Sequence, residues 1–573
     1  MKVYKTLFID FNGIYENKIP NQNTIVLTNL YNNNNVENIN QNTNSNDYSY
    51  SQFEKYLNGI DKSEINLESK NFYLYSFFFY PLSQWFLKIN NLINQNKIDE
   101  NTEIVFSSFS NNKKAFIFEA EGENSGQMLY KKAYFLSYYI KKHFQNKNLN
   151  KIKIIKNYTL SSRISYFLRG FIILHLKLSQ ILFFKFFTFK RNYISSKSER
   201  KVTTILTRGL IQTQFIKPLY DSKPEEFIAI VNESTSNPFR NLKAAKKSFT
   251  DFFYAEGFIY LNDLIKEYLI VLKGYTKFST SNNCSDFFNI SINLIDLVPE
   301  ILIKEFHLKT YSHSINRSII HLNNKERYET KKIISFESLP PFVFFLKKMI
   351  KKELIQIQTT EIFARKQPKF SYADIYFFNN KKTFDQHNII NSHFSENFKL
   401  LNNIKYFDTI KKREMSNFKH IVYFCQPLYY DDELSYIDFL FEFCNSYNYE
   451  FKIKLHPRSN ISMYHNYKKS IIQNTINSVE VLKSCDIAIT RNSSIGLDSW
   501  YLNTPIIFLV NKTLNNEGIS YIPKNYLGTI KDDLTTDKLN ELLPEIINDF
   551  YNNNFHSKLI IDKKKIILDL IGN

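Results

Sequence analysis

The stretch CDIAITRNSSIGLDSWYLNTPIIFL, residues 485–509, decides the fold class of this chain. The apolar and β-branched run at 486–490 predicts a strand, residues 494–502 predict a helix, and PIIFLV (505–510) predicts the next strand. Strands separated by helices on this spacing are typical of a Rossmann-like half.

The same alternation extends upstream to residue 420. Strands are predicted at 420–428 and 450–457, and helices at 432–447 and 478–485. We therefore expect an α/β fold with a C-terminal Rossmann-like domain over 411–573.

The N-terminal part, 1–410, also alternates between strands and helices, which favours a parallel sheet there. Residues 200–400 are harder to assign: VTTILT (202–207) and EFIAIVN (226–232) look like strands, and 258–275 looks like a helix. We expect an insertion, mainly helical, around 158–400 and a linker near 395–418. In the rest of the N-terminal part, strands are predicted at 3–10, 24–30, 103–109 and 114–121, and helices near 71–96 and 125–147.

The chain is strongly basic. Its 573 residues carry a formal charge of +19, which favours anionic partners: nucleic acid, phosphorylated substrates or an anionic membrane. Asn, Lys, Ile, Phe and Tyr are abundant and only 12 residues are Gly, so part of the basicity reflects AT-rich codons. The basic residues are spread out, and no helix-turn-helix, zinc-finger or RNP-like segment is present. A nucleic-acid-binding protein therefore remains only a remote alternative.

The four cysteines are far apart and show no metal-ligand spacing, so we expect a reducing, cytoplasmic compartment and no metal site. The N-terminal apolar run is too short for a signal peptide.

The apolar region 164–190 is interrupted by Arg169, His175, Lys177 and Lys185, so a membrane span is not expected. It predicts either a buried helix or a helix in the membrane interface. In the second case its phenylalanines would face the lipid, and Lys185, Lys190 and Arg191 would face the headgroups.

A histidine follows the predicted strand in FKIKLHPRSN (451–460), and two serines follow the strand at 486–490. Ligands of doubly wound sheets bind outside the carboxyl ends of the strands. We expect His456 and the pair Ser493 and Ser494 to follow neighbouring strands and to face one crevice. Histidine can donate a proton to a leaving phosphate, and Pro457 biases His456 toward an extended conformation.

The serines have two interpretations. The segment NSS before a helix can hold a phosphate with hydroxyl groups and backbone amides, or it can simply cap the helix. Arg458 and Arg491 add positive charge suited to a phosphate or carboxylate, unless they are solvated surface residues.

The segments KLHPR and CDIAITRNSSIGLDSWYLNTPIIFL resemble the donor-binding half of bacterial GT-B glycosyltransferases that use CMP-activated acidic sugars. These are the sialyltransferases, polysialyltransferases and capsule Kdo transferases. The resemblance covers 420–515, and 103–147 more weakly. It implies a GT-B fold, in which two Rossmann-like domains face a cleft, and assigns 1–410 to the acceptor side and 411–573 to nucleotide-sugar binding. By this resemblance His456 contacts the CMP phosphate and assists its departure, and the other donor contacts are Ser493, Ser494, Asn492, Arg458, Gln426 and Asp498.

The acceptor base of these families lies in a motif of two acidic residues and a glycine, for which FIFEAEGENSG (116–126) is an imperfect match. Glu119 and Glu121 are both candidates, and Glu121 is preferred because Gly122 lets the backbone turn and expose it. The alternative is that both are solvated acids at a strand end. The implied reaction is an inverting, metal-independent transfer that needs no cofactor.

The resemblance also implies the partners: a CMP-activated sugar donor and a glycan or lipid-linked glycan acceptor of capsule or lipooligosaccharide synthesis, with peripheral contact with the inner membrane. Two alternatives stay open. The segment 490–508 is also similar to teichoic-acid-type polyol-phosphate polymerases, which use CDP-glycerol, and the chain could be a non-catalytic membrane-associated scaffold.

Overall fold

The computed structural model divides the chain into two compact units. One consists of Met1–Thr359, Ala364–Phe377 and Gln386–Lys399, and the other of Thr360–Phe363, Phe378–Asp385 and Leu400–Asn573. The division at 410 and the roles of the two predicted domains stay predictions. The structure describes residues 3–10, 22–28, 36–38, 80–99, 101–106, 152–154, 160–188, 200–232, 243, 245–280, 284–287, 290–293, 298–325, 328–336, 340–358, 373–379, 381–401, 418–425, 430–456, 461–473, 476–491, 493, 495–510, 526–531, 535–552 and 570.

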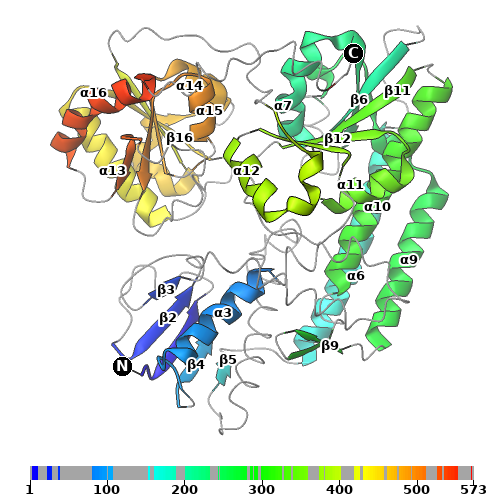
Figure 1. Ribbon diagram of the computed structural model, residues 1–573, viewed down its shortest axis with the longest axis horizontal. Coiled ribbons are helices and arrows are strands. Elements are labelled where there is room, and N and C mark those ends of the chain that lie inside the picture. Colours follow the sequence, from blue (N-terminus) through cyan, green and yellow to red (C-terminus); the bar gives the residue numbers. More distant parts are fainter. Residues whose placement is uncertain are drawn as a thin grey trace. The chain divides into compact units, whose positions relative to one another are not determined.

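The first unit begins with an N-terminal sheet of five parallel strands in the order β3-β2-β1-β4-β5 (Figure 1). The helix after β3 buries Trp85, Phe86 and Ile89. The predicted strands at 3–10, 24–30 and 103–109 are confirmed, whereas 114–121 and 125–147 lie outside the described residues. The elements are β1 (Thr6–Asp10), β2 (Thr24–Thr28), β3 (Val36–Asn38), α3 (Tyr80–Asn94), β4 (Glu103–Phe106) and β5 (Ile152–Ile154).

The same unit contains a larger middle sheet of seven strands in the order β14-β13-β12-β11-β6-β7-β8, whose described pairs are parallel. The strands predicted at VTTILT and EFIAIVN are confirmed as β6 and β7, and the other five were not predicted. Four of these five have only three to five residues, and lysines interrupt the apolar pattern of the longer β11 (YETKKIIS), so their period of two is obscured. The strands are β6 (Arg200–Arg208), β7 (Phe227–Asn232), β8 (Phe252–Tyr254), β11 (Tyr328–Ser335), β12 (Glu353–Ile357), β13 (Ile375–Phe378) and β14 (Phe398–Leu400).

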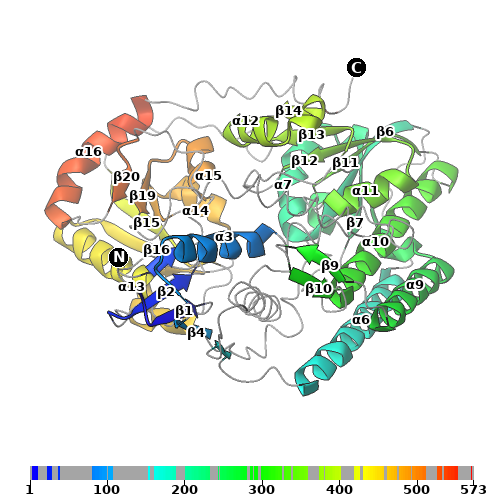
Figure 2. The same ribbon diagram turned by 60° about the horizontal axis from the view of Figure 1, so that its bottom comes forward.

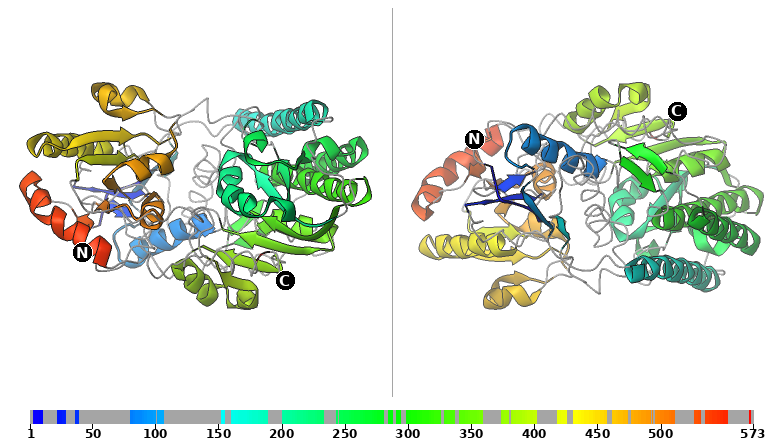
Figure 3. Two further views of the ribbon diagram at one scale, coloured as in Figure 1. Left: turned by 90° about the horizontal axis from the view of Figure 1, so that it is seen from above. Right: turned by 90° about the horizontal axis from the view of Figure 1, so that it is seen from below.

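Helices lie on both faces of the middle sheet (Figure 3). The longest three, α6, α9 and α10, pack together beside this sheet. None of the helices in the described ranges is long and apolar enough to cross a membrane. This part of the chain contains α6 (Leu160–Thr188), α7 (Gly209–Ser222), α9 (Leu261–Thr280), α10 (Val298–Lys325), α11 (Pro340–Met349), α12 (Lys381–Ile390), the short 3-10 turns η3 (Pro224–Glu226), η4 (Ala255–Phe258) and η6 (Ser392–Asn397), and a hairpin of β9 (Cys284–Phe287) and β10 (Ile290–Asn293).

The second unit is built on a C-terminal sheet of six parallel strands in the order β17-β16-β15-β18-β19-β20. All the strands and helices predicted between 420 and 510 are confirmed. The elements are β15 (His420–Phe424), α13 (Tyr430–Ser446), β16 (Glu450–Lys454), η8 (Ile461–Ser470), β17 (Ile471–Ile472), α14 (Ser478–Ser484), β18 (Ile487–Thr490), α15 (Ile495–Tyr501), β19 (Ile506–Val510), β20 (Thr529–Lys531) and α16 (Thr536–Asn552).

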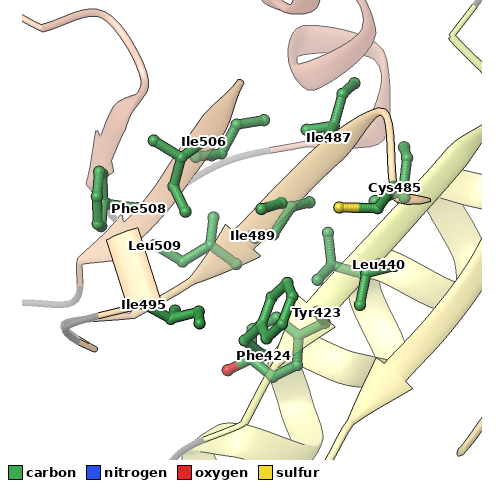
Figure 4. Packing of buried hydrophobic residues seen from close by; sticks show 14 of the residues in the cluster. Tyr423, Phe424, Leu440, Cys485, Ile487, Ile489, Ile495, Ile506, Phe508 and Leu509 are labelled. Carbon is green, nitrogen blue, oxygen red and sulfur yellow. The ribbon is translucent and has the colours of Figure 1, made fainter. Parts of the chain in front are cut away.

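One apolar core holds the C-terminal sheet to its helices. Figure 4 shows part of it, with Leu440 of α13 and Ile495 of α15 packed against side chains of β15, β18 and β19. Every residue of β18 is buried, as expected for a parallel strand covered on both faces. This packing on both faces holds the strands, and therefore their carboxyl ends, in place relative to one another.

The strand order corrects one expectation from the sequence. β16 and β18 were predicted to be neighbours, but β15 lies between them and pairs with both. The chain leaves β15 toward β16 on one side and returns to β18 on the other. The order therefore reverses beside β15, and in open parallel sheets such a reversal is where ligands bind.

Truncation of a core residue of α13 tests the packing of this unit. Ile437 is fully buried, so Ile437→Ala should lower the free energy of unfolding by about 2–5 kcal/mol. Ile461 is 61% exposed, and Ile461→Ala should change it by less than about 0.5 kcal/mol. Urea unfolding followed by circular dichroism measures both, and equal effects of the two variants would show that α13 does not pack as described.

Candidate functional site

Three strands of the C-terminal sheet end together, and hydrogen bonds join their ends. The backbone N–H of Cys425, after β15, donates to the carbonyl of Lys454 in β16 at 3.0 Å. The Thr490 hydroxyl of β18 donates to the carbonyl of Phe424 in β15, also at 3.0 Å. The carboxyl ends of β16, β15 and β18 are thus fixed at one edge of the sheet.

Two of the predicted site residues lie at this edge. His456 follows β16 by two residues and Ser493 follows β18 by three, and both are half-buried. With β15 between them, their strands are about 10 Å apart, which is two strand spacings. The expectation that both residues lie at one carboxyl edge is met, although their strands are not neighbours.

Ser493 has a structural role in addition to any binding role. Its hydroxyl oxygen accepts a hydrogen bond from the backbone N–H of Ile495 at 3.3 Å, and its carbonyl accepts one from Gly496 at 3.1 Å. The helix-cap interpretation is therefore realised in the structure. Asp498 is half-buried in α15, one turn further on.

The remaining predicted site residues lie outside the described part of the chain, and their roles stay predictions. These are the two candidate bases Glu119 and Glu121 and the donor contacts Gln426, Arg458, Asn492 and Ser494.

A buried ion pair lies directly behind this edge. Arg491, the first residue after β18, and Glu433, in the first turn of α13, are both completely buried. A nitrogen of the Arg491 guanidinium is 3.9 Å from a Glu433 carboxylate oxygen. The guanidinium also lies over the ring of Tyr436, 5.5 Å from its centre. Arg491 is therefore not a solvated surface residue, which was one of the two interpretations of its sequence position. Its guanidinium is paired with the Glu433 carboxylate.

The negative charge of Glu433 acts on Tyr423 of β15 and on Cys425, just after that strand. Burial raises the pKa of the Cys425 thiol well above its usual value, and the charge and hydrogen bond of Glu433 raise it further. The Tyr423 hydroxyl is affected in the same direction, with burial again the largest cause of its raised pKa and Glu433 the next. Both groups stay protonated at neutral pH and add no charge to the cluster.

The sequence alone did not identify this cluster. Glu433 ends the acidic run Asp431-Asp432-Glu433, which looks like a solvated helix start. The one available signal was the period of α13, because Glu433, Ile437 and Leu440 share a face and the last two are apolar.

No protein-family model matches this sequence, and neither does any curated protein. Several solved structures show a distant similarity. The glycosyltransferase SnogD from Streptomyces nogalater has a TM-score of 0.40 and 8% identity over 65% of this chain and 99% of its own. The wall teichoic acid polymerase TagF, studied with CDPG, has a TM-score of 0.33 and 14% identity over 72% of this chain and 97% of its own. A UDP-glucosyltransferase from Polygonum tinctorium has a TM-score of 0.40 and 6% identity over 65% of this chain and 98% of its own. At such scores and identities, these similarities assign no function to this chain.

Removing one member of the ion pair should destabilise the second unit. Arg491→Met leaves the Glu433 carboxylate buried without its counter-charge, and Glu433→Gln does the same to Arg491. Each should lower the free energy of unfolding by about 3–5 kcal/mol, whereas the double variant Glu433→Leu with Arg491→Met should recover most of the loss. Urea unfolding of the variants measures both the losses and the recovery.

The exposed pair Lys483 and Glu480, 3.5 Å apart, supplies the control. Glu480→Gln should change the free energy of unfolding by less than about 1 kcal/mol. If Arg491→Met had no greater effect than this control, the buried pair would not have the structural role described.

Proposed function

We propose that this chain is a glycosyltransferase that moves an acidic sugar of the sialic acid or Kdo type from a CMP-sugar to a glycan or lipid-linked glycan acceptor. The observation that supports the proposal best is the placement of His456 and Ser493. They flank the central strand β15 at the carboxyl edge of a parallel sheet, where its strand order reverses. The sequence resemblance around the same two residues supplies the donor class.

In the proposed reaction the acceptor hydroxyl oxygen attacks the anomeric carbon, and the bond from that carbon to the CMP phosphate oxygen breaks. His456 donates a proton or a hydrogen bond to the departing phosphate, and the hydroxyls of Ser493 and Ser494 donate hydrogen bonds to it. The proton of the acceptor hydroxyl passes to Glu121, or to Glu119. Attack opposite to the leaving group inverts the anomeric centre, and none of these steps assigns a role to a metal.

The buried cluster supports this arrangement indirectly. Because Arg491 is held by Glu433 and Tyr436, the residues that follow it leave the sheet from a fixed point. The side chains of His456 and Ser493 extend from backbones about two strand spacings apart, a gap that a bound phosphate between them can bridge.

We propose that the acceptor is met at the cytoplasmic face of the membrane.

The donor class is tested by supplying three donors separately to the purified chain: CMP-sialic acid, CMP-Kdo and CDP-glycerol. Each assay contains an oligosaccharide acceptor, and CMP release is measured by chromatography. We expect release from one of the two CMP-sugars. Release from CDP-glycerol alone would favour the polyol-phosphate alternative, and release from none of the three would overturn the proposal.

His456→Ala should lower kcat with the active donor by about a hundredfold or more, since it removes the group that assists the leaving phosphate. His465 is exposed on η8 in the same unit, so His465→Ala is the matched control and should change kcat less than about twofold. Near-normal kcat of His456→Ala would remove that residue from the mechanism.

A pair of substitutions separates the two roles of Ser493. Ser493→Asp keeps a side-chain oxygen for the α15 cap and so should leave the free energy of unfolding within about 0.5 kcal/mol, but its charge would repel the donor phosphate. We expect the donor KM to rise at least about tenfold. Ser493→Ala should lower the free energy of unfolding by about 1 kcal/mol through loss of the cap. An unchanged donor KM in Ser493→Asp would show that Ser493 only caps α15 and does not contact the donor.

A further inference from the structure

Two helices of the first unit expose an unusual amount of apolar surface. Half of the large hydrophobic side chains that are exposed in the described ranges lie on α6 and α9. On α6, Phe186 is 70% exposed and Phe183 is 53% exposed. The exposed hydrophobic residues of the two helices are Phe171, Ile172, Leu176, Phe183, Phe186, Leu261, Ile265, Leu269 and Ile270, and we call their surface the α6/α9 face.

The opposite stripe of each helix is buried against the protein. Leu174, Ile181 and Phe184 of α6 are buried, as are Leu264 and Val271 of α9. Both helices pack against α10, and α6 also packs against η4. They are thus already anchored in the fold by one side, and the α6/α9 face is a second apolar stripe that this packing leaves uncovered.

The two helices lie side by side (Figure 2) and touch through a hydrogen bond. The Tyr268 hydroxyl of α9 is hydrogen-bonded to Nε2 of His175 in α6 at 2.7 Å. Ile172 and Leu176 lie within one turn of His175, and Ile265 and Leu269 lie within one turn of Tyr268. Exposed apolar residues that gather on two touching helices mark an interaction site.

The charges on these helices are one-sided. The sequence of α6 contains basic residues and no acidic one. The two acidic residues of α9 are paired with cations of α10: Asp263 accepts from Arg317 at 3.1 Å, and an oxygen of the buried Glu267 is 3.9 Å from Nζ of Lys309. Lys266 and Lys273 of α9 are exposed. The face therefore presents apolar side chains next to positive charge.

We propose that the α6/α9 face docks onto an anionic lipid surface. Apolar side chains enter the boundary between headgroups and acyl chains, while nearby lysines bind the acidic headgroups. A second copy of this chain fits less well, because a symmetric contact would bring the same basic residues together. This docking would bring the chain to the membrane at which the proposed function has the acceptor met, but the chemical steps of the proposed transfer do not depend on it.

The structure also revises which residues of the apolar region contact lipid. Phe184 is turned into the protein, and Nζ of Lys185 donates to the carbonyl of Ile259 instead of facing headgroups. Phe183 and Phe186 are the lipid-facing members that the structure describes. The contribution of α9 could not be inferred from the 164–190 segment.

Flotation with lipid vesicles tests the apolar part of the proposal. The full chain should bind vesicles that contain phosphatidylglycerol and bind pure phosphatidylcholine vesicles much more weakly. Phe183→Glu with Phe186→Glu should lower the partition coefficient by at least about a hundredfold, because each phenylalanine contributes about tenfold or more. Ile389, 78% exposed on α12, is the matched control, and Ile389→Glu should change partitioning less than about threefold.

The charge part is tested by reversing two lysines. Lys266→Glu with Lys273→Glu should weaken binding to the anionic vesicles by about thirtyfold or more. Lys468→Glu with Lys469→Glu makes the same charge change at exposed residues of η8 and should have little effect. Equal losses in the two double variants would show that only the total charge matters and would overturn the assignment of the face.

Two further outcomes would overturn the proposal. One is no binding of the unchanged chain to anionic vesicles. The other is a dimer, measured by sedimentation velocity, that the Phe183→Glu and Phe186→Glu changes dissociate, since the face would then be a contact between copies. CMP release with a soluble acceptor should be unaffected by these changes, so a failure of the docking proposal is distinguishable from a failure of the proposed reaction.

Discussion

The buried ion pair between Arg491 and Glu433 is the constraint on which the candidate site depends. An unpaired charge in this position would be strongly unfavourable, because both side chains are removed from water. The pair therefore forces the end of β18 and the start of α13 to meet in one geometry. Tyr423 of β15 and Cys425, just after that strand, line the same cluster, so β15, β18 and α13 meet at it.

We infer that this pair contributes more to the specific local geometry than to the stability of the fold. Hydrophobic residues of the same volume are often as stabilising as a buried ion pair. Here the chain immediately after Arg491 includes Ser493, which also caps α15. The joined ends of β16, β15 and β18 complete the frame. A site that holds a phosphate for transfer needs this kind of fixed geometry, because misplacement of a contact by about 1 Å is costly to catalysis.

The C-terminal half was predictable because each of its strands is a short, uninterrupted apolar run between clear helices, as in DIAIT and PIIFLV. The placement of His456 and Ser493 at one edge followed from parallel strand direction alone. The strand order did not, because it depends on the side to which each crossover packs, and so β15 between them was unexpected. Glu433 was missed because its partner is 58 residues away in sequence and it follows two aspartates.

The first unit was less predictable. Lysines within β11, and the shortness of β12 and β13, concealed most of the middle sheet, although β6 and β7 were recognised. The apolar region 164–190 was expected to be either buried or in the membrane interface. Helix α6 has both a buried and an exposed apolar stripe, a division that depends on where α9 and α10 pack and so is not determined by its own sequence.

The central claim is that the carboxyl edge of the C-terminal sheet binds the phosphate of CMP. Hydrogen exchange followed by mass spectrometry, with and without saturating CMP, tests it directly on the unchanged chain. The account predicts slower exchange in peptides that cover 454–458 and 491–498, and unchanged exchange at the corresponding edge of the middle sheet. CMP-dependent protection confined to the middle sheet, or no protection in either C-terminal peptide, would contradict it.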